Sequence, residues 1–226
     1  MRSKIITRAL YILTTIFIMS ACAPIYVPTT VNTPMFKQKG EVQAAVYGGT
    51  SGFNPQFAYS FTNHFGVMAN GSFQNQEADS TGDFQRHRFA EIGIGYYLKL
   101  NEFGRFEVFG GYGFGDLQAK YDYTLFRDYS DMRFGRVFIQ PAIGFSNKIV
   151  DLSFASRFVI IMVQQNSLSF NRTFFEPCFT AKTGYKYVKF VVQIGYSMPF
   201  NSNNIIEYQP FMFSVGLHFT INKKYD

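Results

Sequence analysis

Few residues in the chain could do acid–base chemistry, and they are scattered. Asp83 and His87 lie four positions apart, whereas the other two histidines, His64 and His218, lie elsewhere in the sequence. A general base must be within hydrogen-bonding reach of a nucleophile or a water molecule, so one Asp near one His is a weak signal for an enzyme. The sequence contains no metal-ligand spacing, phosphate-binding loop or nucleophile motif. We therefore expect no catalytic site, no metal site and no cofactor.

A second group of charged residues occupies segments that are otherwise small or apolar. Both signs occur along the group, so opposite charges can meet across neighbouring segments. An unpaired charge in a narrow, poorly hydrated interior is costly, so we expect these charges to pair. The pattern favours an ion-pair network that closes an interior space, and the alternative is the lining of a small gated pore. The seven members are Glu91, Arg105, Glu107, Arg136, Arg157, Glu176 and Lys182.

The elements that must position these charges are strands, as the last long segment shows. From residue 208 to residue 221 the odd positions are mostly bulky and apolar, and the even positions are small or polar apart from Met212. A period of two indicates a strand with one apolar and one polar face. The same alternation starts at Glu41 and continues almost without interruption. The expected strands span about 41–48, 53–61, 65–74, 86–99, 105–120, 133–146, 150–163, 173–187, 190–197 and 208–221.

The connections between these expected strands alternate in length. Those after the second, fourth, sixth and eighth strands are short, whereas most of the others are longer and polar. Short turns at one end and long loops at the other are typical of transmembrane β-barrels. An even number of strands places both ends of the barrel sequence on the turn side. We expect ten strands, with eight as the alternative.

The composition supports a barrel whose outer face contacts lipid. The 226 residues include 28 Phe, 15 Tyr and 19 Gly but no Trp. A lipid-facing sheet can place many aromatic residues at its surface and in interfacial girdles. A soluble barrel would turn its apolar row inward and carry many Lys and Glu on the other row, but that row consists mainly of Gly, Ala, Ser, Thr and Gln. The sequence therefore predicts an all-β fold, an antiparallel up-and-down transmembrane β-barrel in which every backbone group is paired.

The N-terminal region combines a targeting segment with a linker. Residues 1–21 contain a basic start and an apolar run that is short for a transmembrane helix, which is typical of a signal peptide. The sequence Met19-Ser20-Ala21-Cys22 resembles a bacterial lipobox, whose cysteine is lipidated and becomes the mature N-terminus; an ordinary secretory peptide is the alternative. We expect residues 22–40 to form a lipid-anchored periplasmic linker on the turn side, and packing along or into the barrel mouth is the alternative. With Cys22 acylated, Cys178 has no disulfide partner.

The last expected strand carries a further motif. A polar residue, a spacer, a glycine, two spacers, an aromatic residue, a spacer and a final apolar residue together resemble the C-terminal insertion signal of bacterial outer-membrane proteins. The fixed positions are Ser214, Gly216, Phe219 and Ile221. On this motif, the alternation and the topology, region 41–222 resembles the small outer-membrane barrels related to OmpA and OmpX, with residues 223–226 as a tail. The resemblance implies a Gram-negative outer membrane, contact with its lipid, and insertion by the barrel-assembly machinery.

Three functions are candidates. The favoured one is a non-enzymatic barrel that is structural or that binds a ligand or a partner through its outer loops. A narrow channel for small solutes is the main alternative. A hydrolase or acyltransferase at the outer rim is less favoured, because omptin-type proteases use a second acidic–His arrangement and no later outer loop contains a histidine. The segment Tyr121 to Arg133 is either a solvated loop with an aromatic girdle or an adhesive surface. The net charge is +6, and removal of a signal segment that holds Arg2, Lys4 and Arg8 lowers it by three to about +3, which is too small to argue for nucleic acid.

Overall fold

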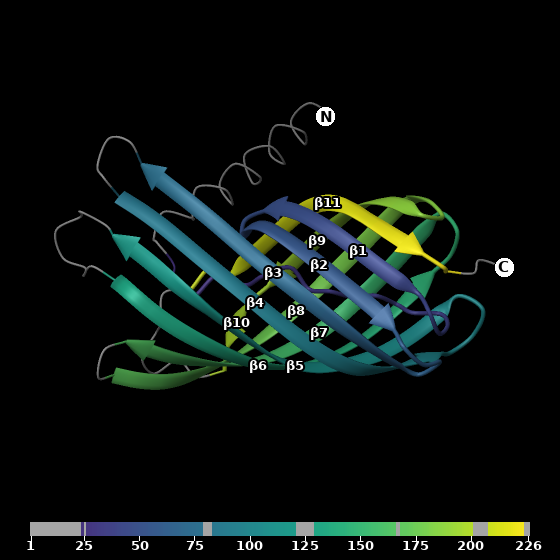
Figure 1. Ribbon diagram of the computed structural model, residues 1–226, viewed down its shortest axis with the longest axis horizontal. Coiled ribbons are helices and arrows are strands. Elements are labelled where there is room, and N and C mark those ends of the chain that lie inside the picture. Colours follow the sequence, from purple (N-terminus) through teal and green to yellow (C-terminus); the bar gives the residue numbers. More distant parts are fainter. Residues whose placement is uncertain are drawn as a thin grey trace, which may run out of the picture.

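The structure is a computed structural model that describes residues 24, 26–78, 83–120, 129–165, 168–200 and 208–223. Within these residues the chain forms one antiparallel sheet that curves into a tube (Figure 1). None of the described residues belongs to a helix long and apolar enough to cross a membrane. The strands are β1 (Val42–Gly49), β2 (Gly52–Ser60), β3 (Phe65–Ala78), β4 (Asp83–Lys99), β5 (Gly104–Lys120), β6 (Tyr129–Ser146), β7 (Val150–Gln165), β8 (Leu168–Tyr185), β9 (Val188–Tyr196), β10 (Met198–Pro199) and β11 (Phe211–Ile221).

The sheet is closed, and its neighbours in space follow the order of the sequence. β1 pairs with β2, and the pairing continues strand by strand to β8 and β9. β11 closes the tube, because it pairs with β9 on one side and with β1 on the other. The short strand β10 follows β9 and pairs with β8. The predicted all-β, antiparallel barrel of ten strands is thus confirmed, with β10 as one extra strand, and the eight-strand alternative is wrong.

The two ends of the barrel differ, and we name them by their connections. The turn end holds the short connections after β2, β4, β6 and β8, together with the start of β1 and the end of β11. The loop end holds the connections after β1, β3, β5 and β7 and the one between β10 and β11.

Several strands extend further toward the loop end than the alternation predicted. β3 and β4 stay paired up to Ala78 and Asp83, so most of the expected loop 75–85 is strand. β7 and β8 likewise stay paired through most of 164–172. Residues 121–128 of a third expected loop lie outside the described residues. The predicted boundaries were wrong because polar residues were assigned to loops, whereas a hairpin can remain paired when both of its faces are polar.

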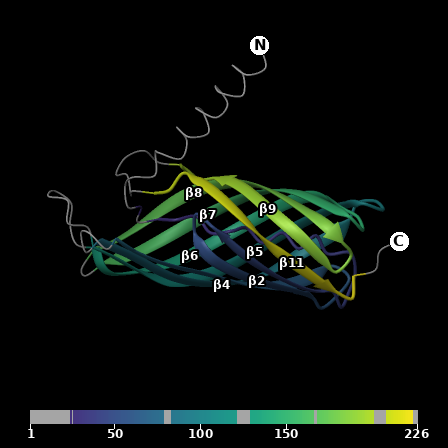
Figure 2. The same cartoon turned by 90° about the horizontal axis from the view of Figure 1, so that it is seen from above.

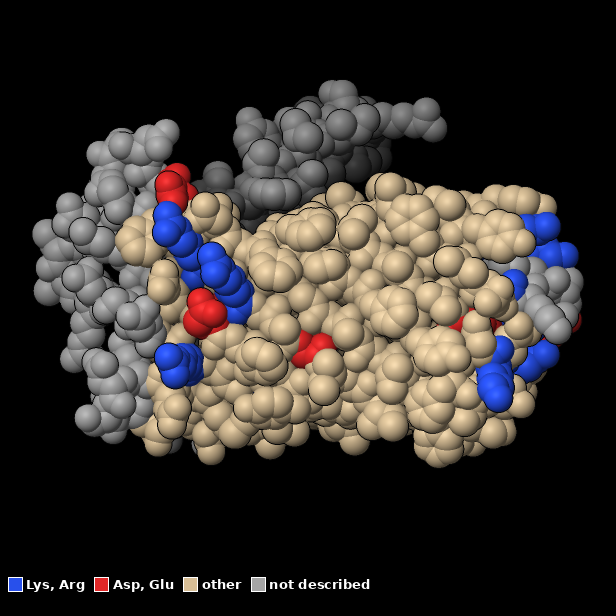
Figure 3. Space-filling model, viewed as in Figure 1, with Lys and Arg blue, Asp and Glu red and all other residues tan. Residues whose placement is uncertain are grey.

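The two faces of the sheet separate the residues as the alternation predicted. Large apolar side chains point outward, and Ile92 and Phe114 are 69% and 65% exposed. The inward row is mostly buried, and besides small, polar and charged residues it holds large apolar ones such as Phe109, Phe138 and Phe174. On the face shown in Figure 3, Lys and Arg gather at the two ends of the barrel, and the broad area between them consists almost entirely of uncharged residues, with small patches of Asp or Glu. The outer surface therefore forms an apolar belt.

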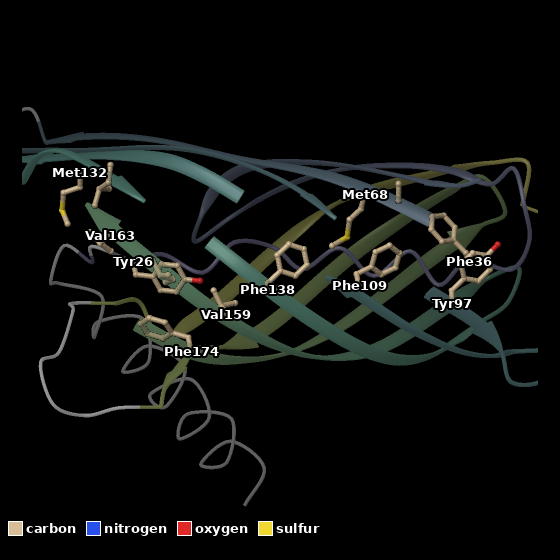
Figure 4. Packing of buried hydrophobic residues seen from close by; sticks show 13 residues of the cluster. Tyr26, Phe36, Met68, Tyr97, Phe109, Met132, Phe138, Val159, Val163 and Phe174 are labelled. Atoms are coloured by element: carbon tan, nitrogen blue, oxygen red, sulfur yellow. The ribbon is translucent and has the colours of Figure 1, made fainter. Parts of the chain in front are cut away.

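A segment of the chain itself occupies the interior. Residues 26–36, which we call the plug, run through the tube as an extended chain (Figures 1 and 2). Every plug residue is buried. Tyr26 lies at the loop end, where it forms a parallel bridge with Tyr208, and Phe36 lies near the turn end beside Tyr97 (Figure 4).

This placement corrects the expected position of residues 22–40. They were expected to form a linker on the turn side, with packing along or into the barrel mouth as the alternative. The described part instead fills the lumen from end to end, so Pro24 lies at the loop end. The segment has no sustained period and includes Pro28 and Pro34, which have no N–H to give to a strand ladder. Alternation therefore could not place it.

Candidate functional site: the plugged lumen

The plug obtains its backbone hydrogen bonds from lumen side chains. In a closed sheet each strand uses its own backbone groups to pair with its neighbours, so side chains must pair with a chain that lies inside. Gln193 of β9 does this for Val31. Its Oε1 accepts from the Val31 N–H at 3.1 Å, and its Nε2 donates to the Val31 carbonyl oxygen at 2.6 Å. The Gln193 side chain thus pairs with both backbone groups of Val31, as a neighbouring strand would do in a sheet.

Other inward side chains donate to successive carbonyl oxygens of the plug. They come from β1, β2, β6 and β8, which lie at different positions around the tube. The carbonyl groups of residues 30–34 are therefore satisfied, as buried backbone groups in folded proteins generally are. The contacts are Gln56 Nε2 to Thr30 O (3.2 Å), Gln140 Nε2 to Asn32 O (2.8 Å), Lys182 Nζ to Thr33 O (3.0 Å) and Gln43 Nε2 to Pro34 O (2.8 Å).

A cluster of buried charges lies midway along the lumen. Glu91 of β4 accepts from Arg136 Nη2 at 2.5 Å and from Arg157 Nη2 at 2.6 Å. The three side chains are at most 1% exposed. Asn70 of β3 donates to the other carboxylate oxygen of Glu91 at 2.9 Å. One carboxylate therefore serves two guanidinium groups.

The plug adds polar groups to this cluster. Arg136 Nη2 also donates to Thr29 Oγ1 at 2.8 Å, and Arg136 Nη1 donates to the Tyr26 hydroxyl oxygen at 3.4 Å. Asn32 Nδ2 donates at 2.7 Å to Asn70 Oδ1, and Asn70 Nδ2 in turn donates to the Glu91 carboxylate. The plug and the charges thus form one continuous network.

Inward aromatic rings fill the space beside the cluster. The Arg136 guanidinium lies 4.0 Å from the centroid of Phe89, and that of Arg157 lies 4.5 Å from the centroid of Phe138. A Cβ atom on Gly113 would stand 2.3 Å from the Phe89 ring, so the glycine makes room for this ring. A cavity beside Phe89 and Arg136 has a volume of only about 10 Å³, which is room for no more than about one water molecule.

At the loop end the plug is held through Tyr26. The Tyr26 hydroxyl donates to Glu176 Oε1 at 2.6 Å, and the Ser197 hydroxyl donates to the same oxygen at 3.1 Å. The Tyr26 ring packs against Phe174 with 4.8 Å between centroids. The Tyr26 carbonyl oxygen accepts from the backbone N–H of Gln209 at 2.9 Å. These contacts fix where the plug enters the lumen.

At the turn end the plug is held through Met35 and Phe36. The Met35 N–H donates to Glu107 Oε2 at 2.8 Å, and Lys223 Nζ donates to the Met35 carbonyl oxygen at 3.2 Å. Phe36 is fully buried, and its ring centroid lies 5.3 Å from that of Tyr97. The plug is therefore bound at both ends as well as in the middle.

A tight turn joins the plug to β1. Glu41 Oε1 accepts from the N–H groups of Lys37 and Gln38 at 2.7 and 2.9 Å. Gly40 lies at φ +84°, a conformation that favours glycine, so the chain can reverse at this residue. Burial raises the pKa of the Glu41 carboxyl, and the nearby Lys223 ammonium and the two amides oppose this shift.

All seven charged residues expected in the interior are buried, but they do not form one ion-pair network. Among these seven residues, ion pairs occur only in the cluster of Glu91, Arg136 and Arg157. Arg105 lies at the turn end and donates to the backbone carbonyls of Asn101 and Glu102, in the connection after β4, and of Gly104 at the start of β5. Three others bind plug atoms instead of each other, and these are Glu107, Glu176 and Lys182.

Two groups of lumen residues were missed in the sequence. Asp151 and Lys189 form a buried ion pair at 2.9 Å near the turn end. The glutamines that bind the plug were treated only as part of a small polar row. The alternation of inward and outward positions could have identified both groups, because each residue lies next to an outward apolar one, such as Leu152 beside Asp151. Parity could not have identified their partners.

The lumen does not assemble an accessible acid–base site from the described residues. His87 Nε2 and Ser72 Oγ are 2.8 Å apart, but Ser72 is fully buried and His87 Nδ1 has no hydrogen-bond partner there. The side chain of Asp83 lies outside the described residues. Within the ranges that the structure describes, no three His, Cys, Asp or Glu residues are grouped as metal ligands. Cys178 is buried and faces the lumen.

The residues of the expected insertion motif lie on the closing strand, β11. Ser214 is buried, whereas Phe219 and Ile221 are 40% and 59% exposed on the outer face. Gly216 pairs with Tyr47 of β1. The motif thus lies where the last strand meets the first. Cys22, the expected lipid-attachment residue, lies outside the described residues.

A scan against protein-family models gave no match to this chain, and a search of curated proteins gave none either.

Proposed function

We propose that the protein is a non-enzymatic barrel of a Gram-negative outer membrane, closed by its own N-terminal segment, and that it acts at its loop end. In this role it is structural or binds a ligand or a partner there. The observation that carries the proposal is the apolar belt, which surrounds a fully closed sheet. The resemblance of the C-terminal motif to an insertion signal adds the barrel-assembly machinery as a partner during insertion.

The apolar belt suits hydrocarbon better than water. A soluble monomer rarely exposes a continuous apolar patch larger than a few hundred Å². In lipid, the same residues would be in their preferred solvent, and a closed sheet leaves no backbone group unpaired. Residues of the belt on successive parts of the tube are Phe57, Ile94, Ile139, Phe179 and Leu217, each more than 40% exposed.

The strand lengths support a membrane crossing. β3 to β8 have 14 to 18 residues, whereas a tilted strand needs only about 9–11 residues to cross a bilayer. These strands are long enough to span the bilayer and to continue beyond it at the loop end, where their outward residues become polar. Such extensions would hold the connections of the loop end away from the lipid.

The plug argues against a channel as the main function. An extended chain fills the lumen axis, and it is bonded to the wall at the loop end, in the middle and at the turn end. The alternative of a narrow channel would require this chain to leave the lumen. We therefore favour a closed barrel.

Insertion into lipid vesicles tests the proposal. We expect the purified mature chain to need detergent for solubility, to float with vesicles, and to shift its gel mobility on heating, as folded membrane barrels do. In the variant Ile139→Arg a charge lies in the belt, and we expect it to destabilise the vesicle-inserted barrel by about 2–4 kcal/mol. Lys148→Arg, in an exposed turn, is the matched control and should change nothing. A chain that stays monodisperse in plain buffer without detergent would disprove the proposal.

A further inference from the structure

The outer face of the barrel is hollowed near the loop end. A groove with a volume of about 550 Å³ lies there, and residues of β5, β6, β7 and β8 line it. Ligand sites in proteins usually have volumes of about 300–1,000 Å³. The groove is therefore large enough to hold part of a small molecule.

Gly135 of β6 forms the floor of this groove, which we call the Gly135 groove. In the register of the sheet Gly135 lies between Phe114 of β5 and Met162 of β7, and all three belong to the outward row. A Cβ atom on Gly135 would stand 2.8 Å from the Tyr112 hydroxyl oxygen and 3.1 Å from Met162 Cε. The missing side chain thus leaves a gap between large apolar neighbours. This gap continues into the apolar belt, where Phe114 is 65% exposed.

Charged and polar side chains line the groove on its side toward the loop end. Asp116 of β5 lies opposite Arg133 of β6, and Gln164 of β7 follows in the same row across the strands. Arg88 of β4 lies opposite Asp116 on its other side. Neither Arg88 nor Arg133 forms an ion pair with another residue of the described ranges. One carboxylate thus faces two guanidinium groups, and the row keeps a net positive charge.

This combination suits a lipid that carries a phosphate. A guanidinium group donates several hydrogen bonds in a planar fork, and such charge-assisted bonds to phosphate are strong. In a membrane the apolar floor would open on hydrocarbon, where an acyl chain can lie against it. Arg133 and Gly135 are two residues apart on one strand, which corresponds to about 7 Å. One lipid molecule can therefore occupy both parts of the groove.

We propose that the Gly135 groove binds one phosphate-bearing lipid of the leaflet at the loop end, with an acyl chain over Gly135 and the phosphate at Arg133. This inference rests on the proposed outer-membrane function, which brings the groove into contact with lipid. Arg88 adds to the positive charge of the row, and Asp116 keeps the two arginines apart. The bound lipid lies at one fixed place on the barrel, below the connections of the loop end.

Native mass spectrometry of the purified chain in detergent micelles measures the binding. The probe is phosphatidylglycerol, which has one phosphate and two acyl chains. Diacylglycerol has the chains without the phosphate, and glycerol 3-phosphate has the phosphate without the chains. Vesicle flotation of the wild type is measured alongside.

Two variants change the groove, and each has a matched control that lies outside it. Gly135→Val fills the floor, and Gly110→Val places the same side chain on an outward glycine of β5 where a Cβ atom meets no close neighbour. Arg133→Gln removes the charge, and Arg86→Gln removes that of an outward arginine that pairs with Glu77. Heat-dependent gel mobility checks that each variant folds. Because Arg133 is exposed, its variant keeps the test valid if Gly135→Val does not fold.

We expect one bound phosphatidylglycerol for each barrel. Gly135→Val and Arg133→Gln should each weaken this binding about tenfold or more, and the two controls should leave it unchanged. Diacylglycerol and glycerol 3-phosphate should each bind at least about tenfold more weakly than the whole lipid.

Equal binding of either partial molecule would overturn the inference, because the groove would then be only an apolar surface or only an anion site. Wild-type binding in either folded variant, or no lipid retained by the wild type, would overturn it as well. If the wild type still floats with vesicles in these cases, the proposed function stands. A chain that stays monodisperse in plain buffer without detergent would remove the proposed function and this inference together.

Discussion

At the residue scale, two buried arginines of the lumen share a single carboxylate as their ion-pair partner. Glu91 accepts from both Arg136 and Arg157, and all three side chains are almost completely buried. A buried ion pair adds little stability compared with an apolar pair, but removing one partner leaves an uncompensated buried charge. Loss of Glu91 would leave two such charges, because both arginines depend on the same carboxylate.

We predict that Glu91→Gln lowers the free energy of unfolding by about 3–5 kcal/mol. The amide keeps the shape of the side chain but removes the negative charge between the two guanidinium groups. Urea titration of the barrel in detergent micelles, followed by intrinsic fluorescence, measures the change as a lower midpoint.

The matched control for this prediction is Glu77→Gln. Glu77 also pairs with an arginine, Arg86, but both side chains are about half exposed. Exposed pairs contribute about 0–1 kcal/mol, so the midpoint should hardly move. Equal midpoints for the two variants would show that burial of the cluster has no energetic consequence.

Parity in the sequence could predict which residues face the lumen, but not what they bind. Glu91, Arg136 and Arg157 were expected in the interior and are found there. Their pairing crosses strands that are not adjacent, because β5 lies between Glu91 and Arg136, and β5 and β6 lie between Glu91 and Arg157; alternation does not fix the register of such strands. Glu107 and Lys182 were expected to pair with other charges, but they bind the plug backbone. The sequence could not reveal these backbone partners, because the plug has no alternating pattern.

At the element scale, the plug is an extended segment whose backbone is bound mainly by side chains of the wall and not by a neighbouring strand. Its Val31 and Met35 N–H groups are bound by side-chain oxygens of Gln193 and Glu107. Proline at positions 28 and 34 removes two donors that the lumen would otherwise have to satisfy. An extended chain rich in Pro and Thr therefore suits a polar tube whose wall supplies mainly side-chain partners.

A disulfide can test the position of the plug along the lumen. Thr33 Oγ1 and Ser153 Oγ of β7 lie 2.9 Å apart. We predict that the double variant Thr33→Cys/Ser153→Cys forms a disulfide under mild oxidation, because the two sulfur atoms would replace oxygen atoms already in contact. The crosslink closes a large loop, which faster migration on a non-reducing denaturing gel would reveal.

Thr30→Cys/Ser153→Cys provides the register control for this crosslink. Thr30 is bound by Gln56 of β2, so its side chain contacts a different part of the wall. We expect no crosslink with this pair. Similar crosslinking of both pairs would mean that the plug slides in the lumen or lies outside it.

At the scale of the whole molecule, the plug and the closure of the barrel depend on each other. β1 and β11 are the first and last long strands of the barrel, and their pairing completes the tube around residues 26–36. The number of strands could be predicted from alternation, since it requires only local patterns. The filled lumen could not, because it results from contacts between a segment without periodicity and strands throughout the sequence.

The closed lumen also follows from the width of the barrel. Barrels of about eight strands are filled by their own side chains, whereas those of about 16–18 leave an aqueous channel. Ten strands lie near the filled limit, with space left for one extended chain. The cross-section of such a chain is about 5 Å by 10 Å, judged from the spacings of strands and sheets. Removal of the plug would therefore leave a bore that a small hydrated ion can enter.

We predict that the wild-type barrel shows no steady openings in planar lipid bilayers. Replacement of residues 26–36 by a Gly–Ser segment of equal length should produce them, because the new segment lacks the side chains that hold the plug and exposes polar groups of the wall to water. Single-channel current recording measures the difference, and Glu77→Gln, which leaves the plug intact, should stay silent. Steady openings of the wild type would show that the plug does not seal the lumen. A silent replacement variant would show that the wall side chains close the bore by themselves, so that the plug contributes stability and direction to the chain but no seal.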